Sequence, residues 1–182
     1  EGVDRAKLGA VAMVVADNVD QEKMGGTLGQ DTDVTIPVVG ISKADGARLR
    51  ETPGPAQLTL DATTRDISAR NVIAQTTTGS PRNVVMVGGH LDSVREGPGI
   101  NDNGSGIAAV LETAVLLGSA PPVTNAVRFG FWGAEEIGIV GSKKYIESLD
   151  IEDLKDIALY LNFDMVGSPN PGYFTYDGNQ ST

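Results

Sequence analysis

The chain has 182 residues, of which 40% are hydrophobic, 21% charged and 5% aromatic, a composition typical of a folded globular protein. Its 14 basic and 24 acidic residues give a formal net charge of −10, which would repel phosphate backbones and anionic lipid headgroups. No apolar run in the sequence approaches the roughly 20 residues that a membrane-spanning helix needs. The composition therefore argues against a nucleic-acid partner and against a membrane-spanning segment.

The chain contains no cysteine and a single histidine, His90. Disulfides and thiolate metal ligands are excluded, so any zinc would be held by nitrogen and oxygen atoms. The sequence begins at Glu1 without a basic and then apolar leader, which indicates a processed product or a piece of a longer protein.

The first third of the chain carries no cluster of side chains typical of a catalytic site and is interpreted as scaffold. The β-branched run 10–16 predicts a buried strand, which a glycine-rich loop at 25–29 separates from a second strand at 36–41. Ser42 is a typical helix N-cap, and the helix that follows should end within the proline-containing segment 51–55.

From residue 58 onward the pattern is that of an α/β protein, in which strands alternate with helices. Alternation at 58–62 and a β-branched run at 69–74 predict two neighbouring strands, and the continuous apolar run 84–89 predicts a strand covered on both faces. The remaining predicted elements are strands at 126–131 and 157–163 and helices at 105–117 and 141–149.

Candidate metal ligands follow three of these predicted strands. His90 follows the strand 84–89, Glu135 and Glu136 follow the strand 126–131, and Asp164 follows the strand 157–163. Asp102 lies in the glycine-rich loop before the helix at 105–117. Ligands of open α/β sheets bind outside the carboxyl ends of the strands, so we expect these side chains to converge on one pocket.

Each of these residues also has an interpretation that involves no chemistry. A lone histidine is usually a surface or core residue, Asp102 and Asn103 could form only a turn and a helix cap, and Glu135 and Glu136 could be a solvated helix start. However, small and apolar residues precede both glutamates, and acids crowded in such surroundings require a cation.

A divalent metal site accounts for all of these residues together. His90, Asp102, Glu136 and Asp164 would supply nitrogen and carboxylate ligands, which suit zinc, and Asp92 could hold the His90 ring through its carboxylate. A bridging carboxylate would allow two ions about 3.5–4 Å apart. Glu135 would remain free as the general base, which makes metal-dependent hydrolysis the expected chemistry.

The chain also resembles the di-zinc aminopeptidases of metallopeptidase family 28, most closely the bacterial secreted leucyl-type enzymes. The resemblance lies in four motifs in the family's order and spacing: Gly88-Gly89-His90-Leu91-Asp92-Ser93, the loop 97–106, Phe131-Trp132-Gly133-Ala134-Glu135-Glu136 and Leu161-Asn162-Phe163-Asp164-Met165. It implies a zinc-exopeptidase-like three-layer α/β fold with helices on both faces of the sheet, incomplete in this chain.

The resemblance assigns a role to each site residue. His90 and Asp164 would bind one zinc ion, Asp102 would bridge two ions, and Glu136 would bind the second ion. Glu135 would be the general base, and Asp92 would support His90. The expected reaction is release of N-terminal, apolar amino acids from peptide substrates.

Residues 8–51 resemble the later part of a protease-associated domain, an insert found in this family. The expected organisation is therefore a partial, β-rich protease-associated domain over residues 1–56, followed by the N-terminal part of the catalytic domain over 57–182. The partner of the first domain is not indicated. The family's first catalytic strand would lie before Glu1, and secretion or attachment to the cell envelope follows from the resemblance alone.

The chain departs from the family pattern at its end. The family completes its second zinc site with a later histidine and places a tyrosine beside it to stabilise the oxyanion, and both positions would fall beyond Thr182. The 182-residue chain alone is therefore expected to be weakly active or inactive.

Two other functions are compatible with the same motifs. One is a carboxypeptidase or another amidohydrolase on the same scaffold, since the motifs determine the metals and the water but not which end of the substrate is held. The other is a non-catalytic, receptor-like homologue, against which the intact Glu135 and the four ligands argue.

Overall fold

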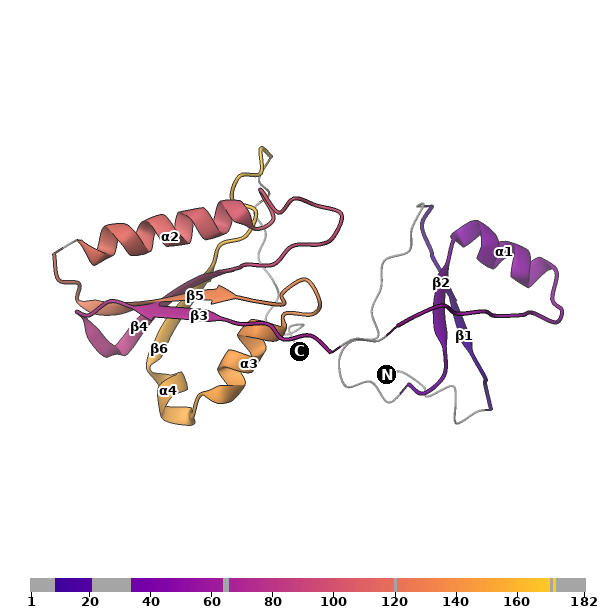
Figure 1. Cartoon of the computed structure of the whole chain (residues 1–182), viewed down its shortest axis with the longest axis horizontal. Coiled ribbons are helices and arrows are strands. Elements are labelled where there is room, and N and C mark those ends of the chain that lie inside the picture. The colour runs from indigo at the N-terminus through magenta and orange to yellow at the C-terminus, as the bar shows by residue number, and fades with distance from the viewer. Residues whose placement is uncertain (1–8, 21–33, 64–65, 120, 171, 173–182) are drawn as a thin grey trace. The chain divides into compact units, whose positions relative to one another are not determined.

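The computed structural model describes residues 9–20, 34–63, 66–119, 121–170 and 172. The chain forms two compact units, Glu1–Arg65 and Asp66–Thr182 (Figure 1). Among the described residues, no helix is both long and apolar enough to cross a membrane.

The first unit contains a parallel pair of strands, β1 (Met13–Ala16) and β2 (Val38–Ile41), followed by helix α1 (Lys43–Glu51). Ser42 caps α1 as predicted, since its hydroxyl oxygen accepts a hydrogen bond of 3.1 Å from the amide of Asp45. The predicted loop at 25–29 lies outside the described residues.

The prediction of a strand at 58–62 is wrong, because these residues have no strand pairing. Leu58 and Leu60 instead line an apolar hollow beside Val14 and Val39 of the two strands. The alternation thus places two leucines at an apolar hollow within the first unit rather than in a sheet.

The second unit contains a four-stranded sheet with the order β3-β5-β4-β6. Strand β3 pairs antiparallel with β5, whereas β4 pairs in parallel with both β5 and β6. The predicted strands are present with shifted ends, and their bounds are β3 (Val72–Gln75), β4 (Ser80–His90), β5 (Asn125–Trp132) and β6 (Ile157–Asn162).

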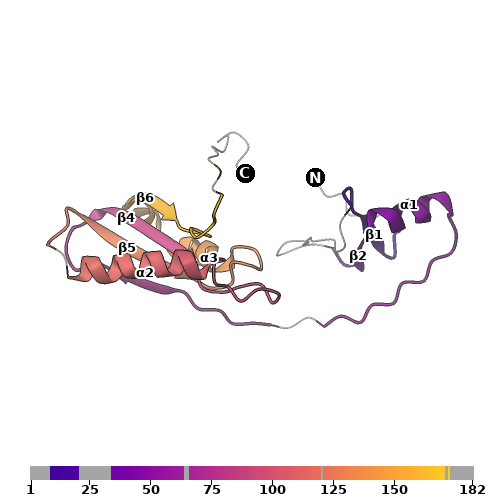
Figure 2. The ribbon, with the colours of Figure 1, turned by 90° about the horizontal axis from the view of Figure 1, so that it is seen from above.

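Helices cover both faces of this sheet, as Figures 1 and 2 show. Helix α2 (Gly104–Gly118) lies on one face, and α3 (Val140–Ser148) and the unpredicted short helix α4 (Ile151–Lys155) lie on the other. The predicted three-layer α/β arrangement is confirmed. The core between α2 and the sheet is formed by apolar residues at helical spacing on α2 and at alternate positions on the strands: Ile107, Val110, Ala114, Leu117, Val85, Val87, Val127, Phe129 and Phe131.

The register of the parallel strands determines where the polar residues lie. His90 is the last residue of β4 and pairs with Trp132 at the end of β5, and Gly88 pairs with Asn162 at the end of β6. The loops that follow these three strands therefore leave the sheet at the same edge. This edge brings together residues that are far apart in the sequence.

Candidate metal centre

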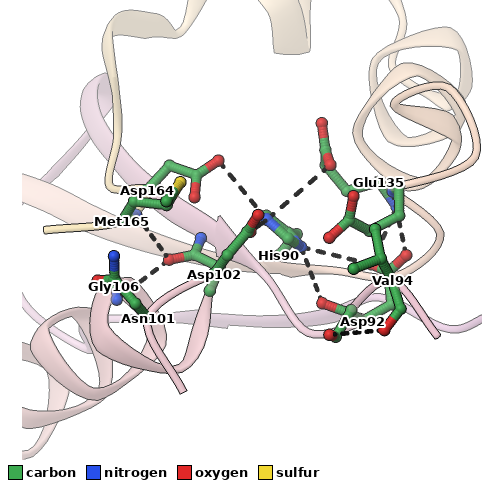
Figure 3. Close-up of polar contacts among 12 residues, drawn as sticks. His90, Asp92, Val94, Asn101, Asp102, Gly106, Glu135, Asp164 and Met165 are labelled. Carbon is green, nitrogen blue, oxygen red and sulfur yellow. Dashed lines mark hydrogen bonds and ion pairs between the residues drawn. The ribbon is translucent and has the colours of Figure 1, made fainter. Parts of the chain in front are cut away.

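The centre of the site is the imidazole of His90, whose side chain is only 3% exposed. Its Nδ1 atom lies 3.0 Å from the backbone carbonyl oxygen of Asp92. Its Nε2 atom lies 3.0 Å from Asp102 Oδ1, 3.5 Å from Asp164 Oδ2 and 3.9 Å from Glu135 Oε2. Figure 3 shows these carboxylates approaching the same side of the ring. One ring nitrogen is therefore held by the backbone, and the other faces several acids.

Glu136 lies beside this group and is the strongest indication that the site fits a cation. His90, Asp102 and Glu136 each offer one possible ligand atom, and these three atoms lie within 4.8 Å of one another. Oxygen Oε1 of Glu136 is buried without a hydrogen-bond partner among the described residues. A buried, unpaired carboxylate oxygen is costly, and a metal ion would relieve that cost. Asp164 is not a member of this three-residue group, although it approaches His90.

Asp92 approaches the His90 ring with both its backbone and its side chain. Its carbonyl oxygen lies 3.0 Å from His90 Nδ1, and its carboxylate oxygen Oδ1 lies 3.7 Å from the same atom. The carboxylate also accepts two hydrogen bonds, of 2.9 Å from the amide of Glu135 and 3.1 Å from the amide of Glu136. Asp92 therefore links the loop after β4 to the loop after β5.

The loop that carries both glutamates is held at a second point. The side chain of Asn71 accepts a hydrogen bond of 3.0 Å from the amide of Gly133 and donates one of 2.8 Å to the carbonyl of Gly141. Between them, Ala134 has a φ of 56°, which is in the left-handed region. Sequence reasoning missed Asn71, because no local pattern connects it to a loop 62 residues away.

Crowding of the acids affects the protonation of the site. Burial raises the pKa of Glu135 above its usual 4.5, and Glu136 and Asp164 raise it further, although His90 acts in the opposite direction. Burial lowers the pKa of His90, but the acids around it outweigh this effect and the pKa is raised above 6.5. A bound cation would replace a proton as the positive charge in this cluster.

Two asparagines beside Asp102 were also missed as parts of the site. Asn103 is the N-cap of α2, in agreement with the sequence interpretation, but it also bonds to the segment that carries Asp164. Asn101 bonds to the same segment. The sequence signals at these positions were the cap at Asn103 and the place of both residues next to a predicted ligand, and neither signal specified a bond to the segment of Asp164.

The structure thus brings His90, Asp102, Glu135 and Asp164 together at one edge of the sheet, with Glu136 next to His90 and Asp102. Its donor set of one imidazole nitrogen and several carboxylate oxygens fits zinc, which accepts both ligand types.

Comparison with known proteins gives consistent results. Residues 71–182 match peptidase family M28, and residues 5–49 match the PA domain. The "probable lipoprotein aminopeptidase LpqL" of Mycobacterium tuberculosis is 68% identical over 176 residues, which are 97% of this chain and 35% of that protein. An "aminopeptidase" of Pseudomonas aeruginosa is 48% identical over 181 residues, or 97% of this chain and 34% of that protein.

Solved structures show the same similarity. The zinc aminopeptidase BSAP from Bacillus subtilis aligns with a TM-score of 0.63 and 36% identity, over 88% of this chain and 39% of that chain. An aminopeptidase from Aneurinibacillus sp. strain AM-1 aligns with a TM-score of 0.71 and 30% identity, over 92% and 42% of the two chains. The chain thus spans about a third of the length of the curated relatives named above. On the match over residues 71–182, the chain belongs to peptidase family M28.

Proposed function

We propose that the protein is a zinc-dependent aminopeptidase that releases N-terminal, mostly apolar residues from peptides. The observation that carries this proposal is the approach of three carboxylates to Nε2 of His90, beside a buried oxygen of Glu136 that has no hydrogen-bond partner in the described part of the chain. The names of the relatives support it, since they include aminopeptidases of bacteria and a probable leucine aminopeptidase of Aspergillus fumigatus.

We assign the residues as follows. His90 and Asp164 hold one zinc ion, Asp102 bridges to a second ion, and Glu136 binds that second ion. The short distances from His90 to Asp102 and Asp164 support the first site, and the group of His90, Asp102 and Glu136 supports a metal position between them. Residues 57–182 are the N-terminal part of the catalytic domain, and residues 1–56 are part of a protease-associated domain.

Zinc, when bound, supplies Lewis-acid polarisation and lowers the pKa of water. Glu135 is not needed as a ligand in this assignment, and its carboxylate lies at the edge of the cluster, 3.9 Å from His90 Nε2. In this role Glu135 would accept a proton from water and return it to the leaving amine. Asp92 positions Glu135 by accepting the hydrogen bond of its amide.

Secretion or attachment to the cell envelope is part of the same proposal. It is supported by the lipoprotein named among the relatives. The peptide substrates are proposed from the family, because this family consists of peptidases.

The experiment compares Glu135→Gln with Glu112→Gln in the full-length protein, since Glu112 is an exposed glutamate on α2. With zinc and a leucyl chromogenic amide, Glu135→Gln is expected to lower kcat by about 10²–10⁴-fold, the contribution typical of a general base. Zinc content and KM should change little, and Glu112→Gln should behave as the parent does.

Two outcomes would contradict the proposal. Parent-like turnover in Glu135→Gln would show that Glu135 is not the general base. Cleavage of an N-terminally blocked peptide at its carboxyl end, with no cleavage of the free amine substrate, would favour a carboxypeptidase instead.

A further inference from the structure

The two asparagines on either side of Asp102 bond to the segment that carries Asp164. We infer that Asn103, assisted by Asn101, is a positioning residue that holds Asp102 and Asp164 at the distance required for tight zinc binding. The inference rests on the proposed function, because it assumes that these two acids are metal ligands.

Asn103 contacts the chain on both sides of Asp164. Its side chain is 2% exposed, and its Nδ2 donates a hydrogen bond of 2.9 Å to the carbonyl of Phe163. Its Oδ1 accepts hydrogen bonds of 3.3 Å from the amide of Met165 and 3.1 Å from the amide of Gly106. Figure 3 shows the bonds from Met165 and Gly106 converging on one oxygen. One buried amide therefore joins the start of α2 to both neighbours of Asp164.

Two glycines provide the space for this amide. A Cβ atom at Gly89 would lie 2.9 Å from the carbonyl oxygen of Phe163 and 3.1 Å from Asn103 Nδ2. A Cβ atom at Gly106 would collide with Asn103 Oδ1 and with the Phe163 carbonyl. Strand β4 and helix α2 can approach the Asn103–Phe163 hydrogen bond only because both positions lack a side chain.

Asn101 makes a second connection to the same segment. Its Oδ1 accepts hydrogen bonds of 3.1 Å from the amide of Gly167 and 2.9 Å from the hydroxyl of Ser105. Its Nδ2 donates a hydrogen bond of 3.1 Å to the hydroxyl of Ser168. Asp102 thus lies between two side chains that both bond to the segment following β6.

The reason for such links is the charge of the ligands. Both Asp102 and Asp164 are acids that approach Nε2 of the same histidine, so they repel each other, and their side chains are 42% and 37% exposed. A neutral amide can donate to a carbonyl and accept from an amide without adding a further negative charge. The free energy of folding then compensates the repulsion between the acids, and zinc binds to a site that is already organised.

The test measures zinc affinity of the whole chain by competition with a chromogenic chelator. In Asn103→Ser the hydroxyl can still cap α2, but it is too short to reach Phe163 and Met165. We expect its zinc dissociation constant to rise about 10–100-fold, the effect typical of removing a group that orients metal ligands.

The matched control is Asp150→Ala. Asp150 caps α4 by accepting hydrogen bonds of 2.9 and 2.8 Å from the amides of Glu152 and Asp153, and among the described residues it makes no hydrogen bond or ion pair with the site. This variant should be less stable than the parent to urea but should bind zinc with the parent's dissociation constant. A purely structural role of Asn103 would give the same pattern as Asp150→Ala.

A second variant keeps the test decisive if Asn103→Ser does not fold. Asn101→Ala removes the hydrogen bonds to Gly167 and Ser168 without adding a charge beside Asp102, and it should weaken zinc affinity by more than about threefold.

Each outcome of these measurements has a distinct meaning. Parent-like zinc affinity in Asn103→Ser, or in Asn101→Ala where the first variant does not fold, overturns the inference while leaving the proposed function intact. Absence of zinc binding by the parent chain would overturn the proposed metal centre and this inference together.

Discussion

Replacement of Glu136 by glutamine is expected to change the stability of the chain in opposite directions with and without zinc. Glu136 Oε1 is buried without a hydrogen-bond partner among the described residues, and its charge adds to the repulsion around Glu135. A buried unsatisfied group costs about 1–3 kcal/mol. Glutamine keeps a polar group at this position but carries no charge, so only the part of the cost that is due to the charge is removed. The zinc-free chain should therefore be stabilised by about 1 kcal/mol, the lower end of that range, because the residue is only half-buried.

Zinc should reverse this order. At a free zinc concentration about 100 times the dissociation constant, binding stabilises the parent by about 2.7 kcal/mol. If loss of the ligand Glu136 raises the dissociation constant about 100-fold, the same zinc concentration stabilises the variant by only about 0.4 kcal/mol. The variant then has about 0.4 kcal/mol from zinc and about 1 kcal/mol from the lost charge, against about 2.7 kcal/mol from zinc in the parent. The parent should therefore be the more stable protein by about 1.3 kcal/mol.

The assay is urea unfolding followed by tryptophan fluorescence, with chelator or with zinc. The chain has a single tryptophan, Trp132, which is 4% exposed at the end of β5 and therefore reports unfolding of the second unit. Glu112→Gln is the control, because Glu112 is exposed on α2 and should shift neither curve. The reasoning would be refuted if Glu136→Gln were less stable than the parent without zinc, or if zinc stabilised both proteins equally.

Three further predictions follow from the same structure. The surrounding acids raise the pKa of His90 above 6.5, so protonated His90 stabilises the zinc-free chain below pH 6.5. This stability is lost as the pH rises through the raised pKa. Zinc affinity should instead increase with pH, as measured by chelator competition between pH 5 and 9. Phe129→Ala should destabilise the second unit by about 3–5 kcal/mol in urea unfolding, since Phe129 is 3% exposed in the core against α2. Met165→Gly should stabilise it by about 0.5–1 kcal/mol, because Met165 has a φ of 48° that glycine adopts without strain, and an unchanged or lower urea midpoint would contradict this.

Much of the sheet could be predicted because its signals are local. The run 84–89 is apolar at every position except its glycines, which is typical of a strand covered on both faces, and β4 forms there. The amide cap of α2 at Asn103 is also a local signal. The segment 58–62 shows the limit of such signals, since it alternates but forms no strand, and two of its leucines line an apolar hollow instead.

The polar contacts of the site could be predicted only in part. Proximity of His90, Asp102 and Asp164 follows from the rule that parallel strands end at one edge of a sheet, and the structure places them there. The further contacts of Asp92 were not predicted. Its carboxylate has two backbone amides of the loop after β5 as partners, and only the folded chain brings them within reach.

The sequence by itself determined which residue types follow each strand, the order of the elements, the α/β class and the family resemblance, because these depend on neighbouring residues and on spacing. The tertiary structure alone decided which atoms meet. The hydrogen bonds from Asn103 to Phe163 and from Gly133 to Asn71 join residues 60 and 62 positions apart. Such pairs depend on how strands and helices pack, and a single sequence contains no local pattern that specifies them.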